Sequence, residues 1–277
     1  MPMRSLQRCG QWPVDHVSAA VVSPGAVCSY GDIDRPYPLA SVSKVLCGWA
    51  TMVAIEEGLL DLDSDVGQPG CTLRHLLSHA GGYPFDGDEP IATPGRQRIY
   101  SNTGIALAAH AVADAADLPF QQYITEAVFA PLAMNSTTLH GSPSVGVTST
   151  VADMTHFLHE LINPQLIDAS TAAQFTTIQF PLLNGVVPGL GRFSPCPWGL
   201  GCEIRGDKTP HWTGTLNSAG TFGHFGGSGT VMWVDPAARA ACIALTDRAF
   251  DQWSADALRL WPELSDAVLG ELSASPQ

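Results

Sequence analysis

The stretch Leu-Ala-Ser-Val-Ser-Lys-Val-Leu, residues 39–46, places Ser41 three positions before Lys44 in otherwise apolar surroundings. Residues at i and i+3 share one face of a helix. Apolar residues continue on nearly every side of this helix to about Glu57. The pattern therefore predicts a central, buried helix that begins at Ala40 or Ser41.

Strand patterns lie towards the two ends of the chain, and helical patterns lie between them. Residues 17–30 predict a β-hairpin, and residues 60–180 carry mostly helical signatures. Helix N-caps are expected at Thr72, Asn102 and Thr150. Later strands are expected at 198–205, 221–225, 230–234 and 240–246, followed by an amphipathic helix at 251–272 with a break or bend at Pro262.

These elements predict an α+β fold, an α/β sandwich in which an antiparallel sheet is flanked by helices and joined to an all-helical lobe. The sheet lobe would be discontinuous, formed by residues 1–60 and 181–277, and the helical lobe would span residues 61–180. A chain of 29.3 kDa with 45% hydrophobic residues can bury such a core.

Composition excludes several classes of partner. The formal net charge of −13 argues against nucleic acid and anionic membranes. No apolar run approaches the length of a membrane span, and residues 1–17 lack the apolar core of a secretory signal, so a cytoplasmic location is expected. Seven cysteines, without C-x-x-C pairs, favour reduced thiols over a disulfide framework.

No cofactor or metal is expected. His75 and His79 have the spacing of a helical zinc pair, but Leu76 replaces the glutamate of that motif and no third ligand is evident. Packing and helix-end hydrogen bonds explain the two histidines as well. The oligomeric state is not indicated by the sequence.

Ser41 and Lys44 are candidate catalytic residues. Lysine, unlike arginine, can lose its proton when it is removed from water. A chain with eleven arginines and two lysines has kept Lys44 where no solvated face is expected. The pair is a nucleophile beside a potential base, at the S-x-x-K spacing of serine acyl-transfer enzymes. An ordinary helix N-cap followed by a lysine is the alternative interpretation.

Tyr100 and Asn102 form a second candidate segment. A phenol with a pKa of about 10 is a poor base at neutral pH. A Lys44 ammonium nearby would favour the phenolate, so we expect the pKa of Tyr100 to fall. Asn102 would hold the substrate or the Lys44 side chain. The alternative is a core tyrosine followed by an N-cap asparagine.

The third segment is Gly-His-Phe-Gly-Gly-Ser-Gly, residues 223–229. Gly226 and Gly227 would allow a substrate to approach the strand closely. The N–H groups of Gly227 and Ser41 are the candidate oxyanion donors. His224 would orient the substrate or shape the pocket. Trp198 is a candidate lining residue of an acyl pocket, together with Trp212 and Phe225.

The order Ser-x-x-Lys, Tyr-x-Asn, His-x-Gly over the chain resembles the serine β-lactamase and penicillin-binding-protein superfamily. The likeness is greatest to the class C β-lactamase-like branch, which includes family VIII-type esterases and D-amino-acid peptidases, and it covers roughly residues 17–250. Further matching stretches are EEGLLDLDSDV at 56–66, LRHLLSHAGGYP at 73–84, IYSNTGIALAAHAV at 99–112, VFAPLAMNSTTL at 128–139, STVADMTHFL at 149–158 and WGLG at 198–201.

This resemblance implies that Ser41 is acylated, that Lys44 and Tyr100 move protons, and that Asn102 touches the acyl chain. His224 stands where many relatives carry the lysine of a Lys-Thr-Gly motif, a cation that suits a substrate carboxylate. Lys208-Thr-Pro210 looks like a displaced copy of that motif, but proline cannot offer the close backbone approach of glycine. The short connection between Leu139 and Ser149 predicts an open site.

The sequence therefore predicts a serine hydrolase that acts through an acyl-enzyme on a small ester or amide, with a small molecule as its partner. A β-lactamase or a D-amino-acid peptidase is the alternative within this class. A non-turnover protein that binds an acyl group, as a sensor does, is the alternative from another class.

Overall fold

The fold is built around one six-stranded antiparallel sheet. The computed structural model describes residues 3–274; residues 1–2 and 275–277, at the ends of the predicted sheet lobe, lie outside the described residues. The strand order is β2-β1-β11-β10-β9-β8. These strands are β1 (Val17–Ser23), β2 (Ala26–Tyr30), β8 (Glu203–Ile204), β9 (Phe222–Gly226), β10 (Thr230–Asp235) and β11 (Ala240–Thr246).

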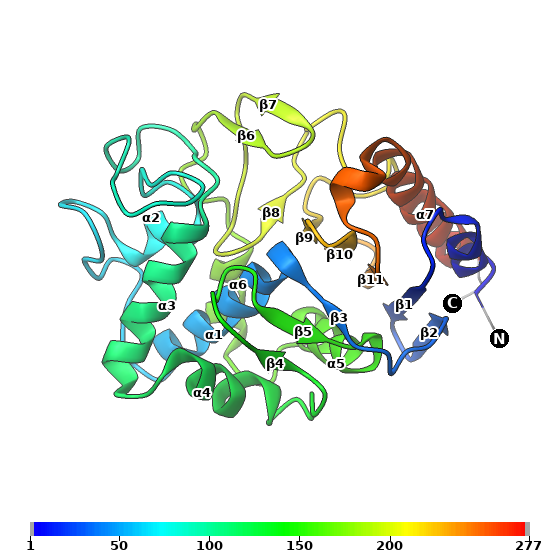
Figure 1. Cartoon of the computed structure of the whole chain (residues 1–277), viewed down its shortest axis with the longest axis horizontal. Coiled ribbons are helices and arrows are strands. Elements are labelled where there is room, and N and C mark those ends of the chain that lie inside the picture. Colours follow the sequence, from blue (N-terminus) through cyan, green and yellow to red (C-terminus); the bar gives the residue numbers. More distant parts are fainter. Residues whose placement is uncertain (1–2, 275–277) are drawn as a thin grey trace.

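Shorter strands and the helices surround this sheet (Figure 1). A small sheet has the order β3-β5-β4, and β6 pairs with β7. Their bounds are β3 (Tyr37–Pro38), β4 (Thr138–Leu139), β5 (Val147–Ser149), β6 (Gly185–Val187) and β7 (Gly191–Phe193). The α-helices are α1 (Ser43–Glu56), α2 (Leu73–Leu77), α3 (Asn102–Ala116), α4 (Phe120–Ile124), α5 (Val151–Ile162), α6 (Ala169–Phe175) and α7 (Ser254–Ala274). Shorter helical turns are η1 (Ser5–Gln11), η2 (Ala40–Val42), η3 (Thr125–Phe129) and η4 (Phe250–Gln252).

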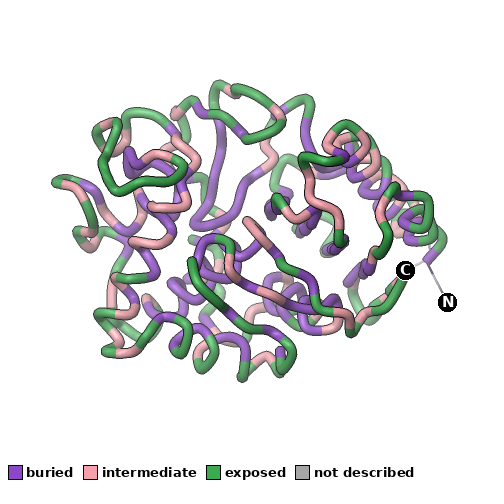
Figure 2. The backbone as a smooth tube through the Cα atoms, viewed as in Figure 1, coloured by how far each residue is buried: buried purple, intermediate pink, exposed green. Residues whose placement is uncertain are grey.

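Alternation along the central strands divides the core into two layers. Because successive side chains of a strand point to opposite faces, Val231 and Trp233 pack with α7, whereas Met232 and Val234 pack with the layer that contains α1 and α5. Helices therefore cover both faces of the sheet. Figure 2 shows that the central strands and α1 are buried. The predicted α+β sandwich is confirmed.

Most strands of the large sheet lie where the sequence predicts them, but the strand predicted at 198–205 is largely absent. The hairpin at 17–30 and the three strands between 221 and 246 are present. The strand expected at 198–205 is reduced to β8, because the Gly199 amide bonds back to the Cys202 carbonyl and Gly201 adopts a φ of 96°. This turn bends the segment towards α1.

Other local predictions meet mixed results. Helix α7 continues through Pro262, so no break occurs there. Thr150 caps α5 as expected, with its side chain accepting from the Asp153 N–H. Cys196 and Cys202 are separate, buried thiols. None of the helices between residues 3 and 274 is long and apolar enough to cross a membrane.

The division of the chain at residues 60 and 181 stays a prediction. Helix α5 belongs to the segment between these positions, yet it packs against β1 and β11 of the large sheet. The same segment supplies β4 and β5, which join β3 to form the small sheet.

Two glycines let α1 approach the 198–202 turn closely. A Cβ at Gly48 would lie 2.3 Å from the Leu200 carbonyl oxygen, and a Cβ at Gly201 would lie 2.7 Å from the Lys44 carbonyl oxygen. Neither backbone can move aside within a packed core. The closeness of this contact holds the helix that carries Lys44 against the turn that carries Trp198.

Gly48→Ala should therefore lower the free energy of unfolding by about 1–3 kcal/mol, the usual penalty for overpacking a core. Gly270→Ala is the matched control, because Gly270 lies in α7 with nothing within 4 Å of the added Cβ. It should stabilise the protein by up to about 1 kcal/mol through helix propensity. Urea unfolding measures both changes, and equal effects would contradict the role of the close contact.

Candidate active site

The Lys44 amine lies at the centre of three hydrogen bonds. Lys44 Nζ is 3.2 Å from Ser41 Oγ, 2.7 Å from Asn102 Oδ1 and 3.0 Å from the Ser144 carbonyl oxygen. Lys44 is fully buried, whereas Ser41 is partly exposed. The amine is therefore sealed from water while the hydroxyl can be reached from outside.

Burial determines the protonation state of this amine. It lowers the pKa of Lys44 from 10.5 to about 7, although Cys47 and Asp86 oppose the shift. A neutral amine has two N–H donors and one lone pair. The oxygens of Asn102 and Ser144 can only accept, so they take the two donors, and the lone pair is left for the Ser41 hydroxyl. This arrangement suits a general base for Ser41.

Asn102 is free to hold Lys44 because it does not cap α3. The predicted N-cap is displaced by one residue: Ser101 Oγ accepts from the Gly104 N–H at 2.9 Å. The Asn102 amide is then used at both ends, since its oxygen accepts from Lys44 and its nitrogen donates to Asp86 at 3.1 Å. Asn102 therefore holds the Lys44 side chain, which is one of the two contacts predicted for it.

Tyr100 and His224 form a second hydrogen-bonded pair. His224 Nδ1 lies 2.6 Å from the Phe225 carbonyl oxygen, so that nitrogen carries the proton and donates. Burial, with a contribution from Lys44, lowers the pKa of His224 to about 4, so the ring is neutral at neutral pH. Its Nε2 is then an acceptor, and the Tyr100 hydroxyl 3.2 Å away donates to it. Tyr100 is therefore a neutral phenol in this pair.

The expected fall in the pKa of Tyr100 is wrong. Burial raises this pKa, and a hydrogen bond with the Ser41 side chain opposes the rise without cancelling it. The Lys44 Nζ lies 4.9 Å from the centroid of the Tyr100 ring, above its face. Desolvation of the phenolate thus outweighs the nearby amine.

The turn before Ser41 is held by β9 and β10. Ala40 has a φ of 46°, a left-handed conformation that is costly for a residue with a side chain. Thr230 Oγ1 donates to the Leu39 carbonyl oxygen at 2.9 Å, and a Cβ at Gly226 would lie 2.3 Å from the same oxygen. Gly226 therefore serves the approach of this turn to β9, which corrects the expectation that it faces a substrate.

Gly227, in contrast, faces open space and lines the same cavity as Ser41. Among residues 3–274, neither the Ser41 N–H nor the Gly227 N–H has an acceptor. Two unpaired donors beside a nucleophile suit a developing oxyanion.

The cavity over Ser41, called the serine cavity below, has a volume of about 300 Å³. The rings of Tyr100, Trp198 and His224 meet there, with centroids 5.5–5.8 Å apart. The predicted Trp198 and Phe225 both line it. Trp212 is a buried core residue that packs against Phe225.

Several residues that line the serine cavity were not predicted from the sequence. These are Phe85, residues 187–189 at the end of β6, Glu203 and Phe250. None of them belongs to the 139–149 connection, so the open site expected from that short connection stays a prediction. No motif marks them, because each comes from a loop or strand end that only the tertiary fold brings to Ser41.

Lys208 is not a substrate cation. It is buried, and its amine lies 3.1 Å from Glu203 Oε1 and 3.2 Å from the Pro197 carbonyl oxygen. Trp212 Nε1 donates to the other Glu203 oxygen at 2.6 Å. Burial alone would raise the pKa of Glu203, but Lys208 and His211 lower it below its ordinary value. The negative charge of the Glu203 carboxylate at the cavity wall is therefore balanced by Lys208, on the side away from the cavity.

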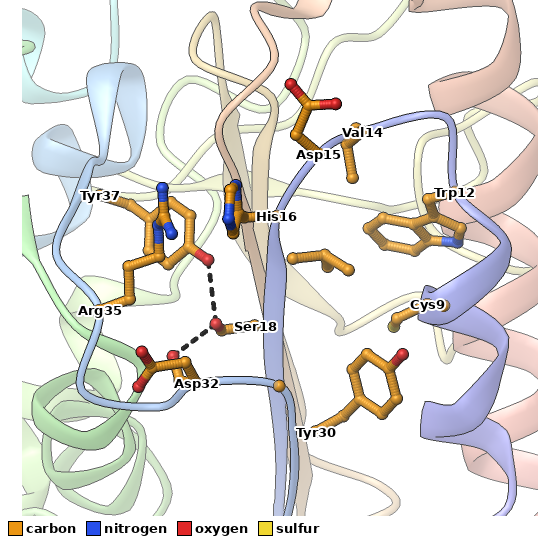
Figure 3. A pocket seen from close by; sticks show the side chains of 13 residues that line it. Cys9, Trp12, Val14, Asp15, His16, Ser18, Tyr30, Asp32, Arg35 and Tyr37 are labelled. Carbon is orange, nitrogen blue, oxygen red and sulfur yellow. Dashed lines mark hydrogen bonds between the residues drawn. The ribbon is translucent and has the colours of Figure 1, made fainter.

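A different cavity of about 290 Å³ lies at the β1–β2 end of the large sheet, lined by residues of η1, of β1 and of the 30–37 segment (Figure 3). Ser18 Oγ donates to the Asp32 carbonyl oxygen at 2.5 Å and lies 3.0 Å from the Tyr37 hydroxyl. His16 Nδ1 is engaged with Asp247 at 2.7 Å. The proton of Ser18 is committed to a carbonyl, so this hydroxyl is not placed beside a base as Ser41 is.

The two histidines with zinc-like spacing have separate structural contacts. His75 Nδ1 lies 3.2 Å from the Thr72 N–H within a capping box, and its ring stacks on Phe180. His79 Nδ1 accepts from the Ser101 N–H at 3.2 Å. Its ring packs edge-on against Trp198, so His79 supports the aromatic wall of the serine cavity.

Comparisons with known proteins agree with this geometry. The model of the beta-lactamase family matches residues 17–262. The structure of a beta-lactamase from Mycobacterium bovis is 48% identical, with a TM-score of 0.94 over 97% of this chain and 99% of that one. A mutant of simvastatin synthase from Aspergillus terreus is 16% identical, with a TM-score of 0.78 over 98% of this chain and 94% of that one, and shares the fold.

A beta-lactamase from Escherichia coli (strain K12) is 26% identical in a match that covers 52% of this chain. The match spans only 55% of the length of that protein.

Because the chain has only two lysines, protein labelled with ¹⁵N-lysine can report the protonation of Lys44 directly. One Nζ signal should titrate near pH 7 and should be missing in Lys44→Arg. Asp86→Asn should move this titration to lower pH, because Asp86 raises the pKa of Lys44. Asp88→Asn, an exposed position in the same loop, should leave it unchanged. A Lys44 signal that stays protonated to pH 10 would refute the base assignment.

Proposed function

The chain belongs to the beta-lactamase family, and from that premise we propose that it hydrolyses a carboxylic ester of modest size through an acyl-enzyme on Ser41. The observation that carries this proposal is the position of Lys44, a buried amine whose lone pair faces only the Ser41 hydroxyl. A base of this kind makes serine a nucleophile at neutral pH.

In the proposed acylation, Ser41 Oγ attacks the ester carbonyl and its proton passes to Lys44. The N–H groups of Ser41 and Gly227 stabilise the oxyanion. The Tyr100 hydroxyl gives its proton to the leaving alcohol, and the Lys44 ammonium returns a proton to the Tyr100 oxygen. Because burial raises the pKa of Tyr100, the phenolate regains this proton readily. Water then releases the acyl group by the reverse sequence.

The polarity of the serine cavity favours a neutral substrate. His224, at the position where relatives carry a cation, is neutral because burial lowers its pKa to about 4. Lys208 is turned away and paired with Glu203. A substrate carboxylate would therefore find no fixed positive charge at the position of His224, which supports an ester over a β-lactam or a peptide.

A β-lactam remains the second candidate, because the 48% identical structure from M. bovis is described as a beta-lactamase. Assays with p-nitrophenyl acetate and nitrocefin separate the candidates. Turnover of the ester alone supports our proposal, and turnover of nitrocefin supports the second candidate. A single stoichiometric burst without turnover would indicate an acyl-binding protein.

A serine-directed phosphonate should add to Ser41, as mass spectrometry of the digested protein can establish. Ser41→Ala should lose the adduct and at least about a thousandfold in kcat. Ser43→Ala is the matched control, because the Ser43 hydroxyl is buried and accepts from the Val147 N–H at 3.1 Å. An adduct on any residue other than Ser41 would overturn the site assignment.

The roles of Lys44 and Tyr100 can be separated by the leaving group. Tyr100→Phe should reduce kcat/KM, which reports acylation, for an alkyl ester by about 10²–10⁴-fold, since an alkoxide leaving group needs a proton. It should affect p-nitrophenyl acetate far less, because p-nitrophenolate leaves without one. Lys44→Arg should reduce both by a similar factor. Equal losses in Tyr100→Phe for the two esters would exclude Tyr100 as the leaving-group acid.

The rate should also depend on pH through Lys44. The active form is the neutral amine, so kcat/KM should rise with pH and level off above an apparent pKa near 7. Asp86→Asn should shift this rise of kcat/KM to lower pH, because Asp86 raises the pKa of Lys44. A profile that is flat between pH 5 and 9 would contradict the proposed base.

A further inference from the structure

A further cavity, called the side cavity here, adjoins the serine cavity. It has a volume of about 340 Å³ and lies between the 84–100 segment and the β6–β7 hairpin. Phe85, Tyr100 and Pro188 line both cavities, so these three residues form the boundary between them. A ligand that extends past Tyr100 would therefore pass from one cavity into the other.

The side cavity exposes large apolar side chains. Phe85, Ile91 and Val186 are 52%, 64% and 45% exposed, and all three line it. A cluster of exposed apolar side chains at a concave surface is typical of a binding site for an apolar ligand group. The Phe85 ring also stacks on Tyr100, with centroids 5.8 Å apart, which continues the apolar surface up to the proposed catalytic phenol.

Arg98, the buried cation that lines the side cavity, already donates its hydrogen bonds to backbone carbonyl oxygens. The Arg98 guanidinium donates to the carbonyl oxygens of Ser78, Cys196, Gln179 and Phe180. Asn184 Oδ1 accepts from the Ser194 hydroxyl at 2.6 Å. Arg192 lies exposed at the rim. The interior therefore offers apolar contact rather than recognition of a charged group.

We propose that the side cavity binds an apolar group carried by the leaving alcohol of the substrate ester. This inference rests on the proposed function, in which the leaving oxygen must face the Tyr100 hydroxyl to receive its proton. Any group attached to that oxygen is then directed past Tyr100 and Phe85. The acyl group stays in the serine cavity, between Gly227 and Trp198.

Acetates of phenol, para-ethylphenol and para-butylphenol test this proposal, because their leaving groups differ in length and little in acidity. Each methylene that enters the side cavity should raise kcat/KM by roughly twofold to fourfold. Ile91→Asp should remove this dependence of kcat/KM on the length of the alkyl group. Leu182→Asp is the matched control: Leu182 is 88% exposed and lines neither cavity.

A kcat/KM that does not change with alkyl length, or equal effects of Ile91→Asp and Leu182→Asp, would overturn the inference while ester turnover itself persists. Calorimetric titration of Ser41→Ala with phenol and para-butylphenol does not need turnover. Tighter binding of para-butylphenol that Ile91→Asp abolishes would support the side cavity even if no ester is hydrolysed. Equal binding of the two phenols would count against it.

Discussion

The Lys44 amine is buried, and it donates hydrogen bonds to the Asn102 side-chain oxygen and the Ser144 carbonyl oxygen, neither of which carries a proton. The proposed chemistry depends on this burial. A pKa of about 7 in place of 10.5 means that the site disfavours the ammonium by on the order of 5 kcal/mol. Only a rigid surrounding can impose that penalty, because a mobile one would admit water. The rigidity comes from α1, which is buried along its first twelve residues and is held against the 198–202 turn by Gly48 and Gly201.

The rest of the site is assembled from segments far apart in the chain. The large sheet presents β9 to the Leu39–Ala40 turn, and Thr230 fixes that turn with a hydrogen bond over 191 positions. Helix α3 brings Asn102 to the amine, and the 141–146 loop brings the Ser144 carbonyl. Each partner is individually ordinary. The pKa of Lys44 is low because these elements meet at one nitrogen and exclude solvent from it.

Sequence patterns predicted the elements and the chemical groups better than their electrostatics. Short strand-like runs separated by turn residues predicted β1, β10 and β11, and the motif order predicted that Ser41, Lys44 and His224 belong together. Ser101 as the α3 cap was missed, since Ser101 and Asn102 are both good N-caps and only the fold decides between them. The pKa of Tyr100 was predicted in the wrong direction, because desolvation depends on burial that no local pattern reveals. Phe85, Phe250 and the 187–189 wall carry no motif at all.

The protonation of Lys44 links the base to the charge of the substrate. A carboxylate bound in the serine cavity would favour the ammonium, raise the pKa of Lys44 and so remove the base at neutral pH. A fixed cation at position 224 could offset this effect, but His224 is neutral and Lys208 is neutralised by Glu203. Asp86 already opposes the low pKa of Lys44 from outside the cavity. Under the proposed mechanism, this balance of charges favours an uncharged substrate, and apolar contacts would then supply most of its binding energy.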